Sequence, residues 1–375
     1  MFMDSSSELV HSLLPIFMSS LLGTSMVTIG VIEGFAEGIA AITKVFSGAI
    51  SDYCGKRKLL AVVGYALSAL TKPVFPIAKT IGWVFGGRFI DRIGKGIRGA
   101  PRDALVADLA PVQLRGAAYG LRQSLDSVGA FIGPLLAVIF MICFSNDIRA
   151  VLWVAVFPAF IAVFMLVVAV HEPDTLKDSA NRQSRLTFVY ALRLPRRFWH
   201  IVILGAVFTL ARFSEAFLIL RARDVGLSMR YVPVIMIVMN AVYSLLAYPS
   251  GAVSDRVSAR ILLAFGLVVL MASDIVLAIA ASPWIAFLGA GLWGLHMALT
   301  QGLLSKLVAD TAPEELRGTA FGIFNLVIGV AILLASVIAG SLWSRFGAPA
   351  TFIAGASFSL IAASGLLLYR PGTQT

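Results

Sequence analysis

The chain has 375 residues, of which 59% are hydrophobic and 13% charged, and its formal net charge is +10. Soluble domains carry about 25% charged residues, so this composition excludes a water-soluble globular protein. Its two cysteines, Cys54 and Cys143, give no disulfide framework. No segment matches a phosphate-binding loop, a GxSxG motif or an HExxH motif, so we predict no enzyme, no cofactor and no metal site. The excess of Lys and Arg is typical of cytoplasmic loops, so we predict no nucleic-acid partner.

Apolar segments recur along the whole chain, and each is long enough to cross a bilayer, which needs about 20 helical residues. Lipid cannot satisfy an open backbone edge, so every span should be helical. Because Asp4 and Glu8 come almost at once, we expect the first helix to lack its leading turns. The sequence predicts an all-α polytopic membrane protein with twelve transmembrane helices, at 1–22, 26–50, 59–78, 81–98, 117–143, 149–170, 198–219, 231–250, 261–281, 284–305, 319–342 and 348–369.

Two sequence patterns occur twice in the same order. Leu105–Gly120 and Leu307–Gly322 agree at eleven of sixteen positions with an offset of 202, and Ser47–Leu60 and Ser250–Leu263 agree at eight of fourteen with an offset of 203. Such a repeat predicts a duplicated unit, and an even number of spans between the copies predicts parallel halves. We therefore expect two pseudo-symmetric six-helix bundles, 1–170 and 198–375, joined by a cytoplasmic linker at 171–197.

The charges of the loops predict the orientation in the membrane. One set of loops is rich in Lys and Arg, whereas the other set holds few. Cytoplasmic loops carry the positive excess, so we place the basic set and both termini in the cytoplasm. The basic set includes Lys56, Arg57, Lys58, Arg102, Arg115, Arg256, Arg260, Lys306 and Arg317.

The loop after the second span has an ordered pattern of small and charged residues. Gly48 permits close helix packing, Asp52 can face the positive N-terminus of another helix, and Gly55 permits a tight turn before Lys56 and Arg57. This pattern resembles the loop signature G-x-x-x-D-x-x-G-x-[RK]-[RK] of the major facilitator superfamily. The resemblance implies two bundles that rock between inward-open and outward-open states around a shared solute site.

The same resemblance implies a cytoplasmic gate. Asp52 is expected to contact the start of the eleventh span near Arg317. The second copy of the loop is less complete, because Ser258 replaces Gly55. The gate candidates are Gly48, Asp52, Gly55, Lys56, Arg57, Asp108, Arg115, Asp255, Arg260, Asp310 and Arg317.

A closer similarity covers most of the chain. Ile32–Gly34 (IEG), Gly94–Ala104 (GKGIRGAPRDA) and Ala216–Arg221 (AFLILR) resemble a bacterial branch of mostly unassigned permeases that includes nickel-resistance exporters. Metal exporters of this kind often carry a His-rich tail, whereas residues 370–375 hold no histidine. We predict a multi-pass protein of the bacterial inner membrane without a metal site.

Charged side chains at membrane depth are costly and are candidates for function. The first half holds as many acids as bases in its spans, which suggests a paired cluster. One interpretation is a structural network of ion pairs, favoured for Arg92, Lys95, Arg122 and Asp126. The other is proton coupling by a carboxylate whose surroundings change, favoured for Glu33 and Glu37. The candidates for proton coupling or substrate binding are Asp4, Glu8, Glu33, Glu37, Arg88, Asp91, Arg122, Asp126, Arg212 and Glu215.

These observations predict a secondary active transporter, expected to be a monomer, that moves a small molecule across the lipid bilayer by rocker-switch alternating access. We expect coupling to protons. Gly129–Pro134 resembles the Gly-Pro motif of exporters, which favours export. Two alternatives remain: uptake of an anionic solute, suggested by Arg88, and a non-transporting sensor or scaffold that retains the fold.

Overall fold

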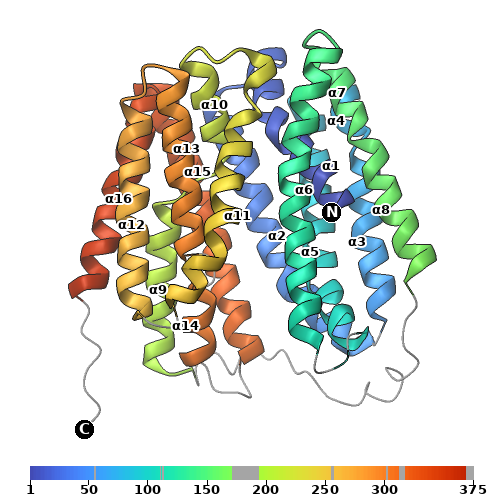
Figure 1. Ribbon diagram of the computed structural model, residues 1–375, viewed down its shortest axis with the longest axis vertical. Coiled ribbons are helices and arrows are strands. Elements are labelled where there is room, and N and C mark those ends of the chain that lie inside the picture. Colours follow the sequence, from blue (N-terminus) through green and yellow to red (C-terminus); the bar gives the residue numbers. More distant parts are fainter. Residues whose placement is uncertain are drawn as a thin grey trace. The chain divides into compact units, whose positions relative to one another are not determined.

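The computed structural model describes residues 1–54, 56–109, 111, 114–170, 194–254, 257–300, 303–311 and 317–368, which are helical almost throughout (Figure 1). The chain divides into two compact units. Unit 1 comprises Met1–Thr24, Phe35–Phe188 and Met229–Val234, and unit 2 comprises Ser25–Gly34, Val189–Ser228 and Ile235–Thr375. The long helix α2 (Met26–Cys54) therefore belongs to unit 2 up to Gly34 and to unit 1 from Phe35 onward.

The helices follow one another with short connections. Unit 1 begins with α1 (Phe2–Ile16) and a π-helical turn (Phe17–Leu21), and after α2 it continues with α3 (Arg57–Thr71), α4 (Val74–Ile77), α5 (Ile81–Leu109), α6 (Arg115–Cys143), α7 (Ile148–Val154) and α8 (Val156–Ala169). The later helices are α9 (Arg196–Leu210), α10 (Ala216–Asp224), a 3-10 turn (Met229–Tyr231), α11 (Val234–Ser254), α12 (Ala259–Ala278), α13 (Pro283–Thr300), α14 (Leu303–Thr311), α15 (Arg317–Phe346) and α16 (Ala348–Leu368).

Eight of the described segments are long and apolar enough to cross a membrane: Met26–Ser47, Arg57–Ile77, Ser124–Cys143, Ile148–Ala169, Met229–Ala247, Arg260–Ala278, Ala320–Phe346 and Ala348–Leu366. The other predicted spans fall on α1, α5, α9 with α10, and α13 with α14, which carry charged residues or are interrupted. Large apolar side chains such as Phe157, Leu245 and Trp284 are 71–79% exposed. Such exposure is expected where the neighbour is lipid rather than water.

Several predicted span boundaries differ from the helices. The span at 59–78 is two helices, because Pro73 cannot donate a backbone hydrogen bond and follows the end of α3. The span at 198–219 is interrupted at residues 211–215, and the span at 284–305 is divided between α13 and α14. By contrast α5, predicted to end at residue 98, continues to Leu109. A fall in hydropathy marks where a span leaves the membrane, not where its helix ends.

In unit 1, glycines bring α3 and α5 into close contact. A Cβ atom on Gly94 would lie 2.7 Å from the Gly64 carbonyl oxygen and 2.7 Å from the Ser68 Oγ. A Cβ atom on Gly64 would lie 2.7 Å from the backbone nitrogen of Arg98. Small residues at helix interfaces allow backbones to approach in membrane proteins, and here they fix how α3 and α5 meet.

In unit 2, glycines allow the start of α2 to pack against α15. A Cβ atom on Gly30 would contact the carbonyl group of Ser336, and one on Gly34 would lie 2.9 Å from the Cβ of the same serine. A Cβ atom on Gly340 would meet the carbonyl of Met26 in return. The two helices therefore share a stripe of glycines.

Arg221 caps the C-terminal end of α12 in unit 2. Arg221 of α10 donates from Nε to the Leu277 carbonyl at 2.9 Å, and from Nη2 to the Ala278 and Ala280 carbonyls at 3.1 and 2.8 Å. Its Nη1 also pairs with Asp224. The last carbonyls of a helix lack intrahelical partners, so Arg221 satisfies the C-terminal end of α12 and neutralises its partial negative charge.

The contact between α3 and α5 generates a stability prediction. Gly94→Val should lower the free energy of unfolding by about 1–3 kcal/mol, because the added side chain overpacks the Gly64 backbone. Gly86→Val in the same helix is the control, since no heavy atom lies within 4 Å of a Cβ at that position. SDS-induced unfolding of the purified protein measures both changes. Equal losses in the two variants would show that helix propensity, not packing, is responsible.

Candidate functional site

Charged side chains from four helices of unit 1 lie in one group, whose members range from buried to exposed. We call this group the charged cluster; it comprises Glu8 of α1, Glu37 of α2, Lys72 at the end of α3, and Asp91, Arg92 and Lys95 of α5. It contains three carboxylates and three cations. Buried charges are tolerated in membranes when they pair with one another, and the distances below show such pairing.

The most buried pair joins α3 to α5. Lys72 Nζ lies 2.9 Å from Asp91 Oδ1, and the two side chains are 1% and 4% exposed. The same ammonium donates to the Ser7 hydroxyl of α1 at 3.2 Å. Because water does not reach this pair, loss of either partner would leave an uncompensated charge.

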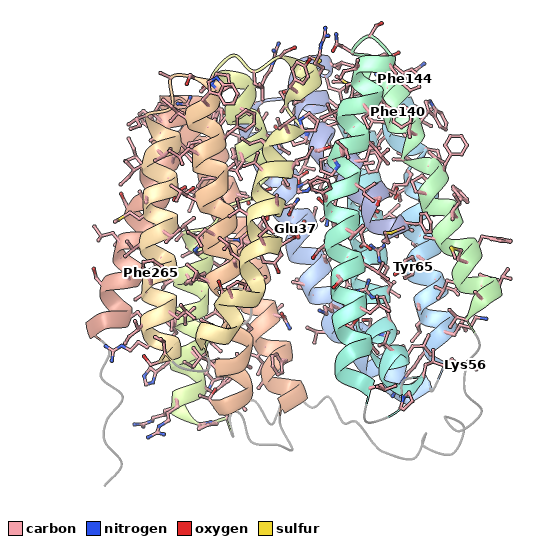
Figure 2. All side chains as sticks on the ribbon, viewed as in Figure 1. Glu37, Lys56, Tyr65, Phe140, Phe144 and Phe265 are labelled. Carbon is pink, nitrogen blue, oxygen red and sulfur yellow. The ribbon has the colours of Figure 1, made fainter. Side chains whose placement is uncertain are left out.

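A second pair joins α2 to α5 and is less enclosed. Arg92 Nη1 lies 3.1 Å from Glu37 Oε1, and Arg92 Nε lies 3.9 Å from Asp91 Oδ2. The arginine side chain is 2% exposed, whereas that of Glu37 is 30% exposed. Figure 2 shows Glu37 between the two ends of α2. Arg92 therefore stands between two carboxylates, of which Glu37 is the more accessible.

Further charges act on this pair. Lys95 interacts electrostatically with both Glu37 and Glu8, and Arg88 also acts on Glu37. Glu8 itself lies 3.5 Å from His11 Nδ1 one turn further along α1. The positive charge around Glu37 thus comes mainly from one helix, α5.

Helix α1 presents its carboxylates beside glycines of α6. A Cβ atom on Gly133 would lie 2.8 Å from the Glu8 Cβ, and one on Gly129 would lie 2.9 Å from the Asp4 Cβ. Asp4 also lies 3.0 Å from the amino group of Met1. The Gly129–Pro134 segment therefore has a packing role in unit 1, because its glycines let the acidic face of α1 pack closely against α6.

A separate network of ion pairs joins α5 to α6 nearer the end of α5. Arg122 lies 2.9 Å from Asp126 and 3.1 Å from Asp103, and Arg102 lies 3.4 Å from Asp126. Arg122 and Asp126 therefore take part in a network of ion pairs, as the structural interpretation of these residues expects. All four side chains are 22–31% exposed, so this network is more accessible than Lys72–Asp91.

The architecture and the sequence agree on a family. The family model described as Major Facilitator Superfamily matches residues 1–222 and residues 216–375. The chain belongs to the Major Facilitator Superfamily. It is therefore a multi-pass membrane protein and a secondary transporter of a small molecule, not an enzyme.

Relatives and solved structures of the superfamily extend over nearly the whole chain. MJ1317 of Methanocaldococcus jannaschii, an uncharacterized MFS-type transporter, is 31% identical over 374 residues, which cover 97% of this chain and 91% of that protein. The multidrug resistance protein MdtH of Proteus mirabilis is 35% identical over 136 residues, 33% of this chain and 31% of that one. The crystal structure of the nucleoside transporter NupG has a TM-score of 0.80 at 14% identity, covering 98% of this chain and 97% of the other, and shows the same fold.

Basic residues from the two copies of the superfamily loop make equivalent contacts. Lys58 Nζ donates to the Val167 carbonyl in the last turn of α8 at 2.9 Å, and Arg260 Nε donates to the Leu366 carbonyl in the last turn of α16 at 2.7 Å. Arg57 donates to the Ala104 carbonyl at 3.4 Å. These contacts lie within one unit each, so the basic residues also join helices of their own half.

The remaining gate candidates are only partly described. Figure 2 shows Lys56, the residue before α3, at the end of unit 1 opposite Phe140 and Phe144 of α6. Gly55 and Asp255 lie outside the described residues. Side chains are not described at six other positions, Gly48, Asp52, Asp108, Arg115, Asp310 and Arg317. The gate therefore stays a prediction.

The candidates associated with unit 2 are less concentrated. Glu33 of α2 is fully buried and lies in the stretch assigned to unit 2. Arg212 and Glu215, predicted inside one continuous helix, lie in the interruption between α9 and α10. His296 forms a 2.8 Å hydrogen bond between Nδ1 and the Gly266 carbonyl and stacks on Phe208.

Sequence reasoning missed the polar residues that support the charges. Arg98 Nη1 donates to the Ser68 hydroxyl at 2.8 Å, and its guanidinium lies 4.8 Å from the centre of the Tyr65 ring. Ser68 in turn donates to the Asp91 carbonyl at 3.1 Å. The sequence does show a hydroxyl group, that of Ser68, in an apolar helix. It does not show which charged residue this hydroxyl will contact. Among the described residues, no group of three or more His, Cys, Asp or Glu could hold a metal ion.

The Lys72–Asp91 pair generates a test by double-mutant cycle. Lys72→Met should lower the free energy of unfolding by about 3–5 kcal/mol, because it strands a buried carboxylate. Lys72→Met with Asp91→Leu should cost less than Lys72→Met alone, since no charge is then left without a partner. Lys79→Met, at an exposed lysine before α5, should change stability by less than about 0.5 kcal/mol. A double variant no more stable than the single one would contradict the buried pair.

Proposed function

We propose that this superfamily transporter works by alternating access, that it exchanges its solute for protons, and that Glu37 takes up the coupling proton. One observation carries the proposal: a carboxylate that is 30% exposed pairs at 3.1 Å with an arginine that is 2% exposed. The Glu37 carboxylate can exchange a proton with water, whereas Arg92, the cation paired with it, is buried in the interior. Asp91 and Lys72 lie too deep to exchange protons as easily.

Protonation of Glu37 would weaken the electrostatic attraction between Glu37 and Arg92. A proton from water binds a carboxylate oxygen of Glu37, the side chain becomes neutral, and its attraction to Arg92 falls. Arg92 then keeps its contact with Asp91, 3.9 Å from its Nε, and its attraction to Glu8. Because α2 carries Glu37 and α5 carries Arg92 and Asp91, protonation weakens the link between these helices. Glu33 is one helical turn from Glu37 and is the second proton-carrying candidate.

Export is the direction we favour. Gly129–Pro134 of α6 resembles the Gly-Pro motif of exporters, and the partial relative MdtH is a multidrug resistance protein. Neither observation names the solute.

Uptake of an anionic solute is the second candidate function. Around Glu37, unit 1 places the cations Arg88, Arg92 and Lys95, which all act on this carboxylate. Such a concentration of cations on α5 would favour an anion as the transported species.

The proton proposal predicts a loss of coupling in Glu37→Gln. Candidate solutes first come from a thermal-shift screen of the purified protein against organic acids, nucleosides, amino acids and lipophilic cations, since a ligand stabilises the protein that binds it. Proteoliposomes containing a pH-sensitive dye then report proton movement when each hit is added. We expect Glu37→Gln to reduce this proton flux to that of empty liposomes while solute exchange between equal pools persists.

Asp147→Asn provides the matched control, because Asp147 is an exposed carboxylate that caps α7 through Arg149 and Ala150, and Asn is an equally good cap. Its proton flux should equal that of the unchanged protein. Undiminished flux in both Glu37→Gln and Glu33→Gln would remove these residues from the coupling role. Binding of a hit without any solute movement would favour the scaffold alternative instead.

A further inference from the structure

Unit 2 contains a groove that neither the transport cycle nor the family assignment uses. It has a volume of about 490 Å³ and lies between α9, α12, α14 and α16. We call it the α9–α16 groove. It opens to the surface, because two of its lining residues, Ile203 and Ile361, are 60% and 61% exposed. Buried apolar residues of unit 2, among them Leu263 and Leu366, form its floor.

The groove is basic at one end and apolar along the rest. Arg197 and His200 come from the first turns of α9, and Arg260 comes from the start of α12. The end of α16 lies beside them, because Arg260 Nε donates to the Leu366 carbonyl at 2.7 Å. Further along α9 the lining residues are Leu204 and Val207, and none of the described residues that line the groove is acidic.

The length of the apolar part suits a hydrocarbon chain. Arg197 and Val207 are ten residues apart on α9, which corresponds to about 15 Å along the helix axis. Two residues that line the groove, Ile203 of α9 and Ile361 of α16, are 60% and 61% exposed. In a membrane-spanning chain such a surface contacts lipid, so the occupant enters from the bilayer.

We propose that the α9–α16 groove binds one anionic glycerophospholipid, with its phosphate at Arg197, His200 and Arg260 and an acyl chain along Ile203, Leu204 and Val207. Charge complementarity selects the headgroup: three basic side chains gathered at one end of the groove favour a lipid with net negative charge over a zwitterionic one. The apolar walls select a lipid over a soluble anion, because burial of methylene groups supplies most of the affinity.

The site has a structural consequence in unit 2. Its lining residues belong to helices far apart in sequence, and Arg260 already connects α12 to α16. A phosphate placed between Arg197 and Arg260 would link the start of α9 to the same pair of helices. The lipid would therefore stabilise the end of unit 2 at which α9 and α12 begin.

Native mass spectrometry of delipidated protein tests the proposal, with phosphatidylglycerol and phosphatidylethanolamine of identical acyl chains as probes. We expect tighter binding of phosphatidylglycerol. Replacing two of the basic side chains, in Arg197→Gln/His200→Gln, should weaken its binding at least about 5-fold, since each Lys or Arg near a lipid headgroup contributes about 1 kcal/mol. Arg196→Gln is the control, because Arg196 is exposed on the same turn of α9 but does not line the groove.

A second variant fills the apolar part of the groove. Gly365 lines the groove, and no heavy atom lies within 4 Å of a Cβ at this position. Gly365→Phe should therefore fold normally and displace both lipids, whereas Gly86→Phe in α5, at a similarly open glycine, should not. The proposal is overturned if the two lipids bind equally, if Arg196→Gln and Arg197→Gln/His200→Gln lose equal affinity, or if Gly365→Phe retains lipid. Displacement of the lipid by inorganic phosphate would also overturn it, since that would identify a soluble anion as the occupant.

Discussion

Hydrocarbon offers no hydrogen-bond partner to a polar group, and this constraint explains most polar contacts of both units. At helix ends, long cationic side chains reach main-chain carbonyls that have no partner in their own helix. Lys58, Arg221 and Arg260 do so at the ends of α8, α12 and α16, and Arg149 donates to the Pro76 carbonyl at 2.7 Å. Within the charged cluster, carboxylates meet cations. These internal contacts limit how the groups can be rearranged, whereas both carboxylate oxygens of the buried Asp274 in α12 have no hydrogen-bond partner among the described residues.

The two units meet this constraint differently. Unit 1 holds most of the charges, and it fixes the Lys72–Asp91 pair through the close approach of α3 and α5 at Gly64 and Gly94. The rigid backbone contact leaves these two charges little freedom. Among the carboxylates of the charged cluster, Glu37 is the most exposed, at 30%. Unit 2 is mainly apolar, and its basic groups lie at helix ends, where they suit contacts to carbonyls and to lipid phosphate.

Much of the architecture could be predicted from the sequence, because apolar spans and a repeat are local or periodic signals. The i,i+4 pair Arg122–Asp126 was predictable for the same reason. The Lys72–Asp91 pair was not, since nineteen residues separate its members and their meeting depends on how α3 packs on α5. Pro73 indicates the break after α3. Residues 211–215 (ARFSE) contain neither Pro nor Gly, so the sequence does not indicate the break between α9 and α10.

Substrate-binding roles could not be derived in this way. They depend on side chains from several helices, and no short motif specifies them. The position of Arg212 and Glu215 illustrates the difficulty: a helical pattern places them on a regular face, while the interruption between α9 and α10 frees both from helical geometry.

One contact of that interruption with another helix is made by a buried serine. Ser336 of α15 accepts a hydrogen bond from the Ser214 backbone nitrogen at 3.3 Å, and the same residue is the one against which Gly30 and Gly34 of α2 pack. Ser336 therefore contacts both α2, which carries Glu33 and Glu37, and the non-helical segment that carries Arg212 and Glu215. A sliding movement of α2 along α15 would therefore disturb the hydrogen bond that holds the segment between α9 and α10.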